Sequence, residues 1–160
     1  MAVKRISGCE SGLPYGFITP DLYSSESGQE MPLSKMQHPI DILFDFNLGD
    51  AATVPATGTW TVLRARAPGF ITGFDAVLMD CGTTGDIDFE IKLNDSEKMA
   101  SALTIGNADT NGVWEAGSID GGATGFAFAA DDLIKVTVTN DSSNDGKGPK
   151  VNVRGYYVGD

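Results

Sequence analysis

The chain has 160 residues, 41% of them hydrophobic and 21% charged, which suits one domain with a hydrophobic core and excludes wholesale disorder. Twenty-two acidic residues against 11 basic ones give a net charge of −11, which disfavours binding to the phosphates of nucleic acids and to anionic membranes. One histidine and two cysteines leave few groups for catalysis or for a transition-metal site.

The first 39 residues differ in composition from the rest of the chain. They hold four of the seven prolines and follow neither a period of 2 nor one of 3.6, so no long helix or central strand is expected there. We predict an extended N-terminal arm over residues 1–39 that contacts a neighbouring subunit or a partner, with folding back onto its own domain as the alternative. The candidate contact residues are its large apolar side chains: Leu13, Tyr15, Phe17, Ile18, Leu22, Tyr23, Met31, Leu33 and Met36.

From residue 40 the chain changes to short β-type segments separated by turn residues. The alternation is clearest over residues 86–94, where Ile87, Phe89 and Ile91 share one face while Asp86, Asp88 and Glu90 share the other. A period of 2 over this length is typical of a half-buried strand. The predicted strands, in chain order, are 40–48, 59–67, 70–79, 86–94, 99–105, 113–119, 125–129, 133–139 and 149–158.

Regularly spaced short strands with glycine-rich turns indicate an all-β antiparallel sandwich or barrel. Eight or nine strands fit within residues 40–160, and eight is the number in a jelly roll. We therefore predict an eight-stranded antiparallel jelly-roll sandwich over residues 40–160, preceded by the arm. No run of about 18 apolar residues occurs, so no membrane-spanning segment is expected.

The residues that carry chemistry in other proteins are sparse, and no catalytic, cofactor-binding or metal-ligating residue is assigned. His38, the one imidazole, precedes Pro39 at the junction of arm and domain, where a surface or packing role is expected. Cys9 and Cys81 are interpreted as free thiols in a reducing cytosol. A loose calcium site of turn oxygens in 107–112 or 140–145 is the less favoured alternative.

Four aromatic residues, Trp60, Trp114, Tyr156 and Tyr157, match two interpretations. In a β-sandwich such residues mostly pack in the core or at an interface. A sugar-stacking platform is the less favoured alternative.

The segment from Ala67 to Val158 resembles the jelly-roll domain of capsid decoration (cement) proteins of tailed bacteriophages. The resemblance is carried by a proline-glycine turn that opens a strand, two alternating strands and a C-terminal strand after a glycine-rich turn. These are Ala67-Pro-Gly-Phe-Ile-Thr-Gly-Phe, Gly85-Asp-Ile-Asp-Phe-Glu-Ile-Lys-Leu-Asn-Asp, Ala100-Ser-Ala-Leu-Thr-Ile, Phe128-Ala-Ala-Asp-Asp-Leu-Ile-Lys-Val-Thr-Val-Thr and Lys150-Val-Asn-Val-Arg-Gly-Tyr-Tyr-Val. The acidic strand faces and the arm are not general features of that family.

The resemblance implies a non-enzymatic virion structural protein, made in the bacterial host cytoplasm and located on the outer capsid surface. Its implied partners are the major capsid protein and itself as a homotrimer, without nucleic acid, membrane or cofactor. Residues 1–39 carry three basic and four acidic residues, net −1, while residues 40–160 carry 8 and 18, net −10. We therefore expect the arm to dock and the acidic sandwich to face outward. The alternative function is a carbohydrate-binding module of a phage fibre or receptor-binding protein.

Overall fold

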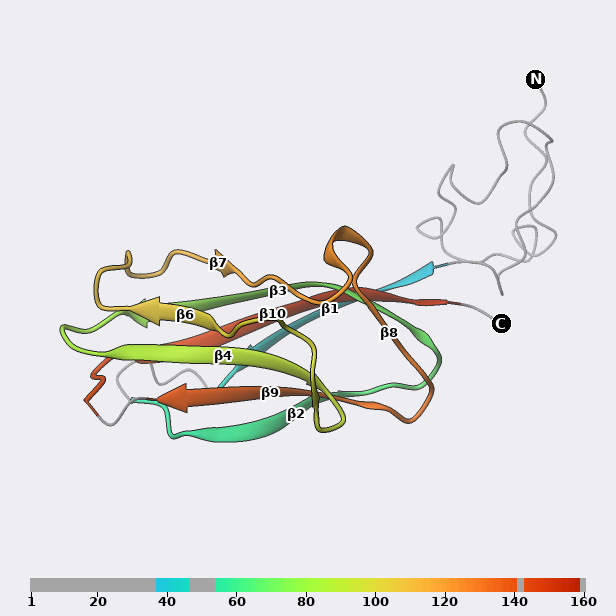
Figure 1. Cartoon of the computed structure of the whole chain (residues 1–160), viewed down its shortest axis with the longest axis horizontal. Coiled ribbons are helices and arrows are strands. Elements are labelled where there is room, and N and C mark those ends of the chain that lie inside the picture. Colours follow the sequence, from blue (N-terminus) through green and yellow to red (C-terminus); the bar gives the residue numbers. More distant parts are fainter. Residues whose placement is uncertain (1–36, 47–53, 141–142, 159–160) are drawn as a thin grey trace, which may run out of the picture. The chain divides into compact units, whose positions relative to one another are not determined.

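The computed structural model describes residues 37–46, 54–140 and 143–158, and within these ranges the regular structure is almost entirely β (Figure 1). Two of the strands are β1 (Gln37–Asp45) and β3 (Gly69–Asp80). A short 3-10 turn, η4 (Gly122–Thr124), lies between the seventh and eighth strands. The other strands are β2 (Gly58–Arg64), β4 (Asp86–Leu93), β5 (Ser96–Glu97), β6 (Leu103–Gly106), β7 (Glu115–Ala116), β8 (Phe126–Phe128), β9 (Leu133–Asn140) and β10 (Lys147–Val158).

The strands form two antiparallel sheets that pack as a β-sandwich. The first sheet has the order β1-β10-β3-β7, with β8 also paired to β3, and we call it the β10 sheet. The second has the order β2-β9-β4-β5, with β6 also paired to β4, and we call it the β9 sheet. Figure 1 shows the two layers running lengthwise beside each other. The predicted all-β antiparallel class is confirmed.

The core consists of the inward-facing residues of both sheets. Alternate residues of a strand point to opposite faces, so one row of each strand enters the core and the other faces solvent. Ile87, Phe89 and Ile91 of β4 are fully buried, as the alternation predicts. Val136 of β9 and Val153 of β10 are also fully buried, one from each sheet. The non-polar contact between the two sheets therefore holds the sandwich together.

One side of the sandwich, between edge strands β1 and β2, is closed by aromatic rings. Phe46, directly after β1, packs edge-on against Trp60 of β2 with ring centroids 5.0 Å apart, and against Phe44 at 4.9 Å. All three side chains are only half-buried, although they pack against the core. This side is therefore less completely covered than the centre of the sandwich.

Several strand boundaries differ from the sequence-based ones. Residues 37–39 were assigned to the arm but pair with β10 as the start of β1. Pro39 fits there because β1 lies at a sheet edge, where a missing N–H leaves no ladder bond unmade. The predicted strand 99–105 is reduced to β6, and 113–119 is reduced to the two residues of β7. The remaining residues of the arm, 1–36, lie outside the described residues.

A single glycine allows the chain to enter β8. Gly125 has φ 69° and ψ −166°, a conformation that is essentially restricted to glycine. A Cβ atom at this position would overlap the backbone carbonyl of Ile71 in β3. By contrast, Gly122 in the same turn has φ 57° and open space around it.

These two glycines form a matched pair. We expect Gly125→Ala to lower the free energy of unfolding by at least about 3 kcal/mol, because strain and a backbone overlap combine. Gly122→Ala should lower it by about 1–2 kcal/mol, the strain of a left-handed residue alone. Urea unfolding followed by circular dichroism measures both, and equal effects would contradict the packing of this turn on β3.

A second comparison tests the assignment of core and surface rows. Phe89→Ala removes a fully buried ring and should lower the free energy of unfolding by about 3–5 kcal/mol. Thr61→Ala, at an exposed position of β2, should change it by less than about 0.5 kcal/mol. The same urea titration decides between them, and a loss below about 1 kcal/mol for Phe89→Ala would disprove its place in the core.

Candidate interaction surface

The nine apolar arm residues predicted as contacts, from Leu13 to Met36, all lie outside the described residues. Their role therefore stays a prediction. The candidate surfaces that the structure does describe are the outer faces of the two sheets and the edge where β1 lies.

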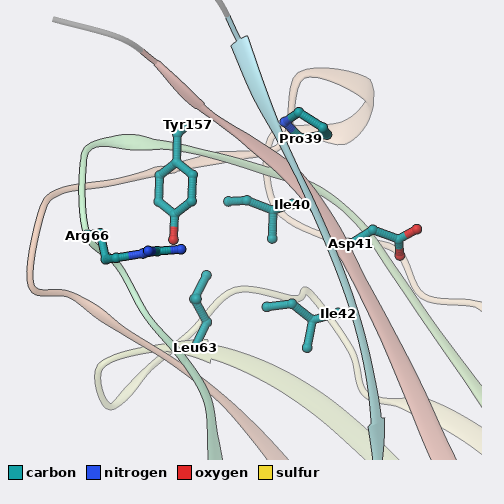
Figure 2. A pocket seen from close by; sticks show the side chains of 7 residues that line it. All are labelled: Pro39, Ile40, Asp41, Ile42, Leu63, Arg66 and Tyr157. Carbon is teal, nitrogen blue, oxygen red and sulfur yellow. The ribbon is translucent and has the colours of Figure 1, made fainter. Parts of the chain in front are cut away.

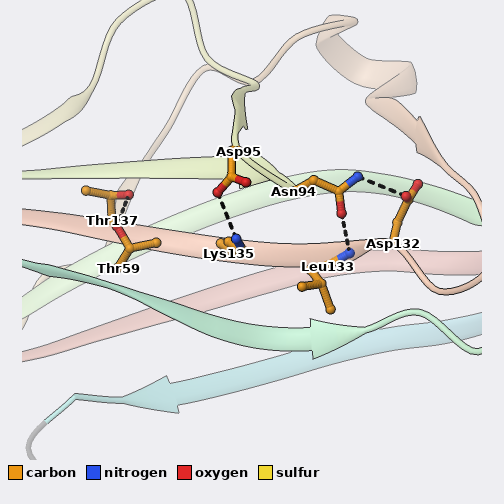
Figure 3. Close-up of polar contacts among 7 residues, drawn as sticks. All are labelled: Thr59, Asn94, Asp95, Asp132, Leu133, Lys135 and Thr137. Carbon is orange, nitrogen blue, oxygen red and sulfur yellow. Dashed lines mark hydrogen bonds and ion pairs between the residues drawn. The ribbon is translucent and has the colours of Figure 1, made fainter.

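The outer face of the β9 sheet is polar. Thr59 of β2 and Thr137 of β9 share a hydrogen bond of 2.9 Å between their hydroxyls (Figure 3). Thr104 of β6 donates to the carboxylate of Asp88 in β4 at 2.6 Å. These hydroxyl and carboxylate groups satisfy one another across neighbouring strands and leave a hydrated face.

The β4–β5 turn is fastened to the start of β9. Asn94, with φ 55°, accepts a hydrogen bond from the Leu133 N–H at 2.9 Å and donates one to Asp132 at 2.9 Å (Figure 3). Lys135 forms an ion pair of 2.8 Å with Asp95, and the hydrogen bond and positive charge lower the pKa of Asp95. The donated hydrogen bond from Asn94 is the main cause of a lowered pKa at Asp132. These contacts shape a turn and offer no reactive group.

The outer face of the β10 sheet carries apolar side chains instead. Leu43 of β1 is 63% exposed and Met79 of β3 is 43% exposed, both in outward rows. Phe70 and Tyr156, opposite each other in β3 and β10, bring their rings to 5.5 Å. Exposed apolar side chains that share one sheet face are typical of an interaction surface.

The same face is extended by residues beside β7. The Gly112 N–H donates to the Leu78 carbonyl at 2.8 Å, and Glu115 pairs with Ala76, so Trp114 runs alongside Val77. Val77 is only 1% exposed although it belongs to the outward row of β3. Trp114 itself is 44% exposed. An apolar cluster therefore exists outside the main core.

Two opposite-charge pairs cross the strands of this face, while Asp41 of β1 is exposed and joins none of the ion pairs of the described residues. Lys150 of β10 lies 3.3 Å from Asp45, and Arg154 lies 2.7 Å from Asp75 of β3. Burying a paired charge requires no countercharge from the other side, although desolvation still opposes it. Exposed apolar groups make this face better suited to burial than the polar face of the β9 sheet.

A shallow pocket of about 210 Å³ lies where the N-terminal half of β1 meets the end of β2. Ile40 and Ile42 of β1 and Leu63 of β2 form its apolar walls, and the hydroxyl of Tyr157 points toward Arg66 (Figure 2). Pro39 and Asp41 complete the lining. The pocket is small and open, and polar groups contribute to its lining at least as much as apolar ones, with Asp41 and Arg66 as its charged residues.

The four aromatic residues considered as a sugar platform are dispersed. Trp60 packs on Phe46, Tyr157 packs on Phe128 at 5.8 Å, and Tyr156 packs on Phe70. Trp60 and Tyr157 contact the core, which confirms the packing interpretation for these two.

The oxygen-rich turns considered for calcium have internal hydrogen-bonding partners. The Asn111 amide oxygen accepts the Cys81 N–H at 2.7 Å, and Asp109 accepts the Gly106 N–H at 2.8 Å. Asp145 accepts from the Thr83 and Thr84 N–H groups at 2.7 and 3.0 Å, which lowers its pKa to about 2. Among the described residues, no group of three or more His, Cys, Asp or Glu side chains is placed to hold a metal ion.

The described cysteine and histidine occupy ordinary structural positions. Cys81 is a buried free thiol directly after β3, as predicted, and burial is the main cause that raises its pKa. His38 is exposed in β1, opposite Tyr157 in register. Cys9 lies outside the described residues.

Comparisons with known proteins do not identify a family for this chain. No protein family model and no curated protein matches the chain. A solved structure of infectious bursal disease virus, Gt strain, is similar over 75% of this chain, with 12% sequence identity and a TM-score of 0.31. The match covers 32% of that structure's chain, and a similarity at this level says nothing of function. Within the described ranges, no helix has the length and apolar character needed to cross a membrane.

The apolar outer face of the β10 sheet was not predicted from the sequence. The alternation within each strand predicts which residues point outward. However, Leu43, Met79 and Tyr156 come from three strands that are far apart in the chain. Only the strand order brings them to one face.

The Asp145 contact predicts a pH dependence of stability. Because the folded-state pKa of Asp145 lies below its ordinary value of 3.8, its stabilising effect is complete above about pH 5 and is lost as the pH falls toward 2. The difference in free energy of unfolding between the wild type and Asp145→Asn should therefore shrink over this range. Urea unfolding at several pH values measures it, with Asp120→Asn at an exposed turn as the control. A difference independent of pH would contradict the assigned contact.

Proposed function

We propose that the chain is a non-enzymatic structural protein of a virion, a capsid decoration protein that binds the outer capsid of a tailed phage as a homotrimer. In this role it stabilises contacts between major capsid subunits and needs neither cofactor nor nucleic acid. The observation that carries the proposal is the outer face of the β10 sheet, where exposed apolar side chains lie among charges that the chain pairs itself.

The strand order supports a jelly-roll form of the sandwich. Apart from the two-residue strands β5 and β7, four strands remain in each sheet, in the orders β1-β10-β3-β8 and β2-β9-β4-β6. Successive strands mostly cross from one sheet to the other, and the last strands return beside the first ones. Two interlocked Greek keys of eight strands have this arrangement.

A protein that acts by binding alone fits the physical requirements of capsid stabilisation. A ligand that binds only the assembled shell stabilises the shell by mass action. Three copies joined in one trimer multiply a weak contact into a strong one. The acidic charge of the sandwich, net −10 over residues 40–160, favours mutual repulsion between decorated particles.

The alternative of a carbohydrate-binding module retains one favourable observation, the exposure of Trp114 beside β7. A sugar ring stacks on such a side chain when polar partners surround it. A glycan array with the wild type and Trp114→Ala tests this reading directly. Glycan binding that depends on Trp114, without binding to particles, would favour the alternative over the virion role.

The proposed function is tested on virus particles purified from a lysate of cells infected with a phage that encodes this sequence. We expect the protein to co-sediment with intact particles, and immunogold labelling should place it on their outer surface. Light scattering of the isolated protein should give about 50 kDa, three times the chain mass of 16.8 kDa.

The face that carries the proposal is tested by a matched pair of variants. Met79→Asp places a charge on the apolar face of the β10 sheet and should lower occupancy on particles at least about tenfold. Thr61→Asp places the same charge on the exposed outer face of the β9 sheet and should leave occupancy within about twofold. Absence of the wild type from particles would disprove the virion role, and equal occupancy of both variants would disprove the role of this face.

A further inference from the structure

The pocket at the β1–β2 side contains an arginine that has no acidic partner. Arg66 is one of the residues that line this space of about 210 Å³. The chain has twice as many acidic as basic residues, yet none of the ion pairs or hydrogen bonds within the described ranges includes the guanidinium of Arg66. An exposed cation that lies unmatched beside a pocket is free to bind an anionic group.

Arg66 differs from Arg64, two residues earlier, which is paired. The guanidinium of Arg64 lies 3.0 Å from the Asp131 carboxylate. Between the two arginines, Ala65 is 1% exposed, and its backbone N–H and carbonyl bond to the backbone of Asp132 and Asp131 at 2.8 and 2.9 Å. These bonds anchor the backbone from which the side chain of Arg66 extends. The guanidinium is therefore presented to the pocket from a fixed segment.

A hydroxyl group lies beside the same guanidinium. The hydroxyl of Tyr157 in β10 points toward Arg66 (Figure 2), and no hydrogen bond within the described ranges engages it. The Tyr157 ring packs edge-on against Phe128 with ring centroids 5.8 Å apart, and this contact restricts the direction of the hydroxyl. A guanidinium and a hydroxyl that meet at one point supply several N–H and O–H donors for a carboxylate.

The apolar part of the lining favours an alkyl group next to such a carboxylate. Ile40 and Ile42 of β1 and Leu63 of β2 lie beside Arg66 (Figure 2). Asp41, the acidic residue of the lining, directs its carboxylate away from Arg66, because neighbouring residues of a strand face opposite sides. Drug-sized ligands occupy pockets of about 300–1,000 Å³. A pocket of about 210 Å³ therefore suits a smaller molecule or a single amino-acid residue.

We propose that this pocket binds an aliphatic carboxylate, either a free branched-chain acid or the C-terminal residue of a polypeptide. Arg66 and Tyr157 bind the carboxylate, and the alkyl group contacts Ile40, Ile42 and Leu63. The planar guanidinium matches a carboxylate through two N–H groups, which adds direction to the attraction between the charges. The inference goes beyond the virion role and does not depend on it.

Electrostatics favours a ligand with a single negative charge. The net charge of −11 repels anions in general, and this repulsion grows with the number of charges on the ligand. One carboxylate in contact with Arg66 gains an attraction at short range that offsets part of the repulsion. A cationic ligand would instead lie against the unmatched guanidinium. Polyanions and cations are therefore both disfavoured.

The test uses the full chain with labelled isoleucine and leucine methyl groups, and N-acetyl-leucine as the probe. We expect millimolar N-acetyl-leucine to shift the methyl NMR signals of Ile40, Ile42 and Leu63 in a saturable way. N-acetyl-leucine amide has the same alkyl group without the carboxylate and should bind at least about tenfold more weakly. Acetate has the carboxylate without the branched alkyl group and should also bind at least about tenfold more weakly.

Two arginine variants form a matched pair. Arg66→Gln removes the guanidinium from the pocket and should weaken the binding of N-acetyl-leucine at least about tenfold. Arg64→Gln removes the same charge from the arginine that pairs with Asp131 and should leave binding within about twofold. Tyr157→Phe keeps the ring and should weaken binding about three- to tenfold, because one hydrogen bond is lost. Methyl spectra without ligand establish that each variant retains the sandwich.

A comparison of two acids distinguishes the two sources of the ligand. The free acid 4-methylpentanoate has the alkyl group and carboxylate of leucine without its amide, whereas N-acetyl-leucine carries the amide of a chain terminus. Binding of 4-methylpentanoate at least as tight as that of N-acetyl-leucine would assign the pocket to free acids. Tighter binding of N-acetyl-leucine would assign it to a C-terminal residue. Both results support the shared chemistry.

Four outcomes would overturn the proposal. The first is the absence of saturable methyl shifts with either acid. Equal binding of N-acetyl-leucine amide would show an apolar pocket without an anion site, and equal binding of acetate would show an anion site without an alkyl site. An effect of Arg66→Gln no larger than that of Arg64→Gln would remove the arginine from the site. None of these outcomes bears on particle occupancy, which tests the virion role separately.

Discussion

The strands of this protein alternate with a period of 2, and one row of each strand is buried against the opposite sheet. Phe89 and Ile91 of β4 and Val153 of β10 are fully buried because the two sheets cover each other. Burial of one row leaves the other row of every strand as surface. The two outer faces and the open edges are therefore what the fold offers to partners, and their chemistry distinguishes them.

The exposure of apolar side chains separates these surfaces within a strongly acidic chain. The β9 sheet exposes threonines and carboxylates that bond to each other, as in the Thr104–Asp88 contact. The β10 sheet pairs Asp45 with Lys150 and Asp75 with Arg154, and its exposed apolar groups lie among these pairs. The β9 sheet pairs its charges as well, through Lys92 with Glu90 and Lys135 with Asp95. What distinguishes the β10 sheet is its exposed apolar side chains, whose burial is favourable. This difference is the physical basis for placing a partner on the β10 sheet.

Much of the fold was predictable from local pattern, and little of the candidate site was. Strands β1, β3, β4, β9 and β10 were predicted because their alternation persists over many residues. The short strands β5 and β7 have two residues each, too few for any period to be recognised. The predicted contacts were the apolar residues of the arm, which lie outside the described residues. The apolar face and the pocket beside Ile40 combine residues from distant strands, and no local pattern marks such a combination.

Local sequence pattern was sufficient to predict an antiparallel β structure, the buried rows of its strands and the positions of its turns. Those properties follow from side-chain polarity and backbone conformation over a few neighbouring residues. The position of β1 at an edge, the contact of Asp45 with Lys150, and the shared face of Leu43 and Met79 became visible in the folded chain alone. Strand order depends on which pairings bury the most apolar surface across the whole chain. That choice is a global one, made among contacts between residues far apart in sequence.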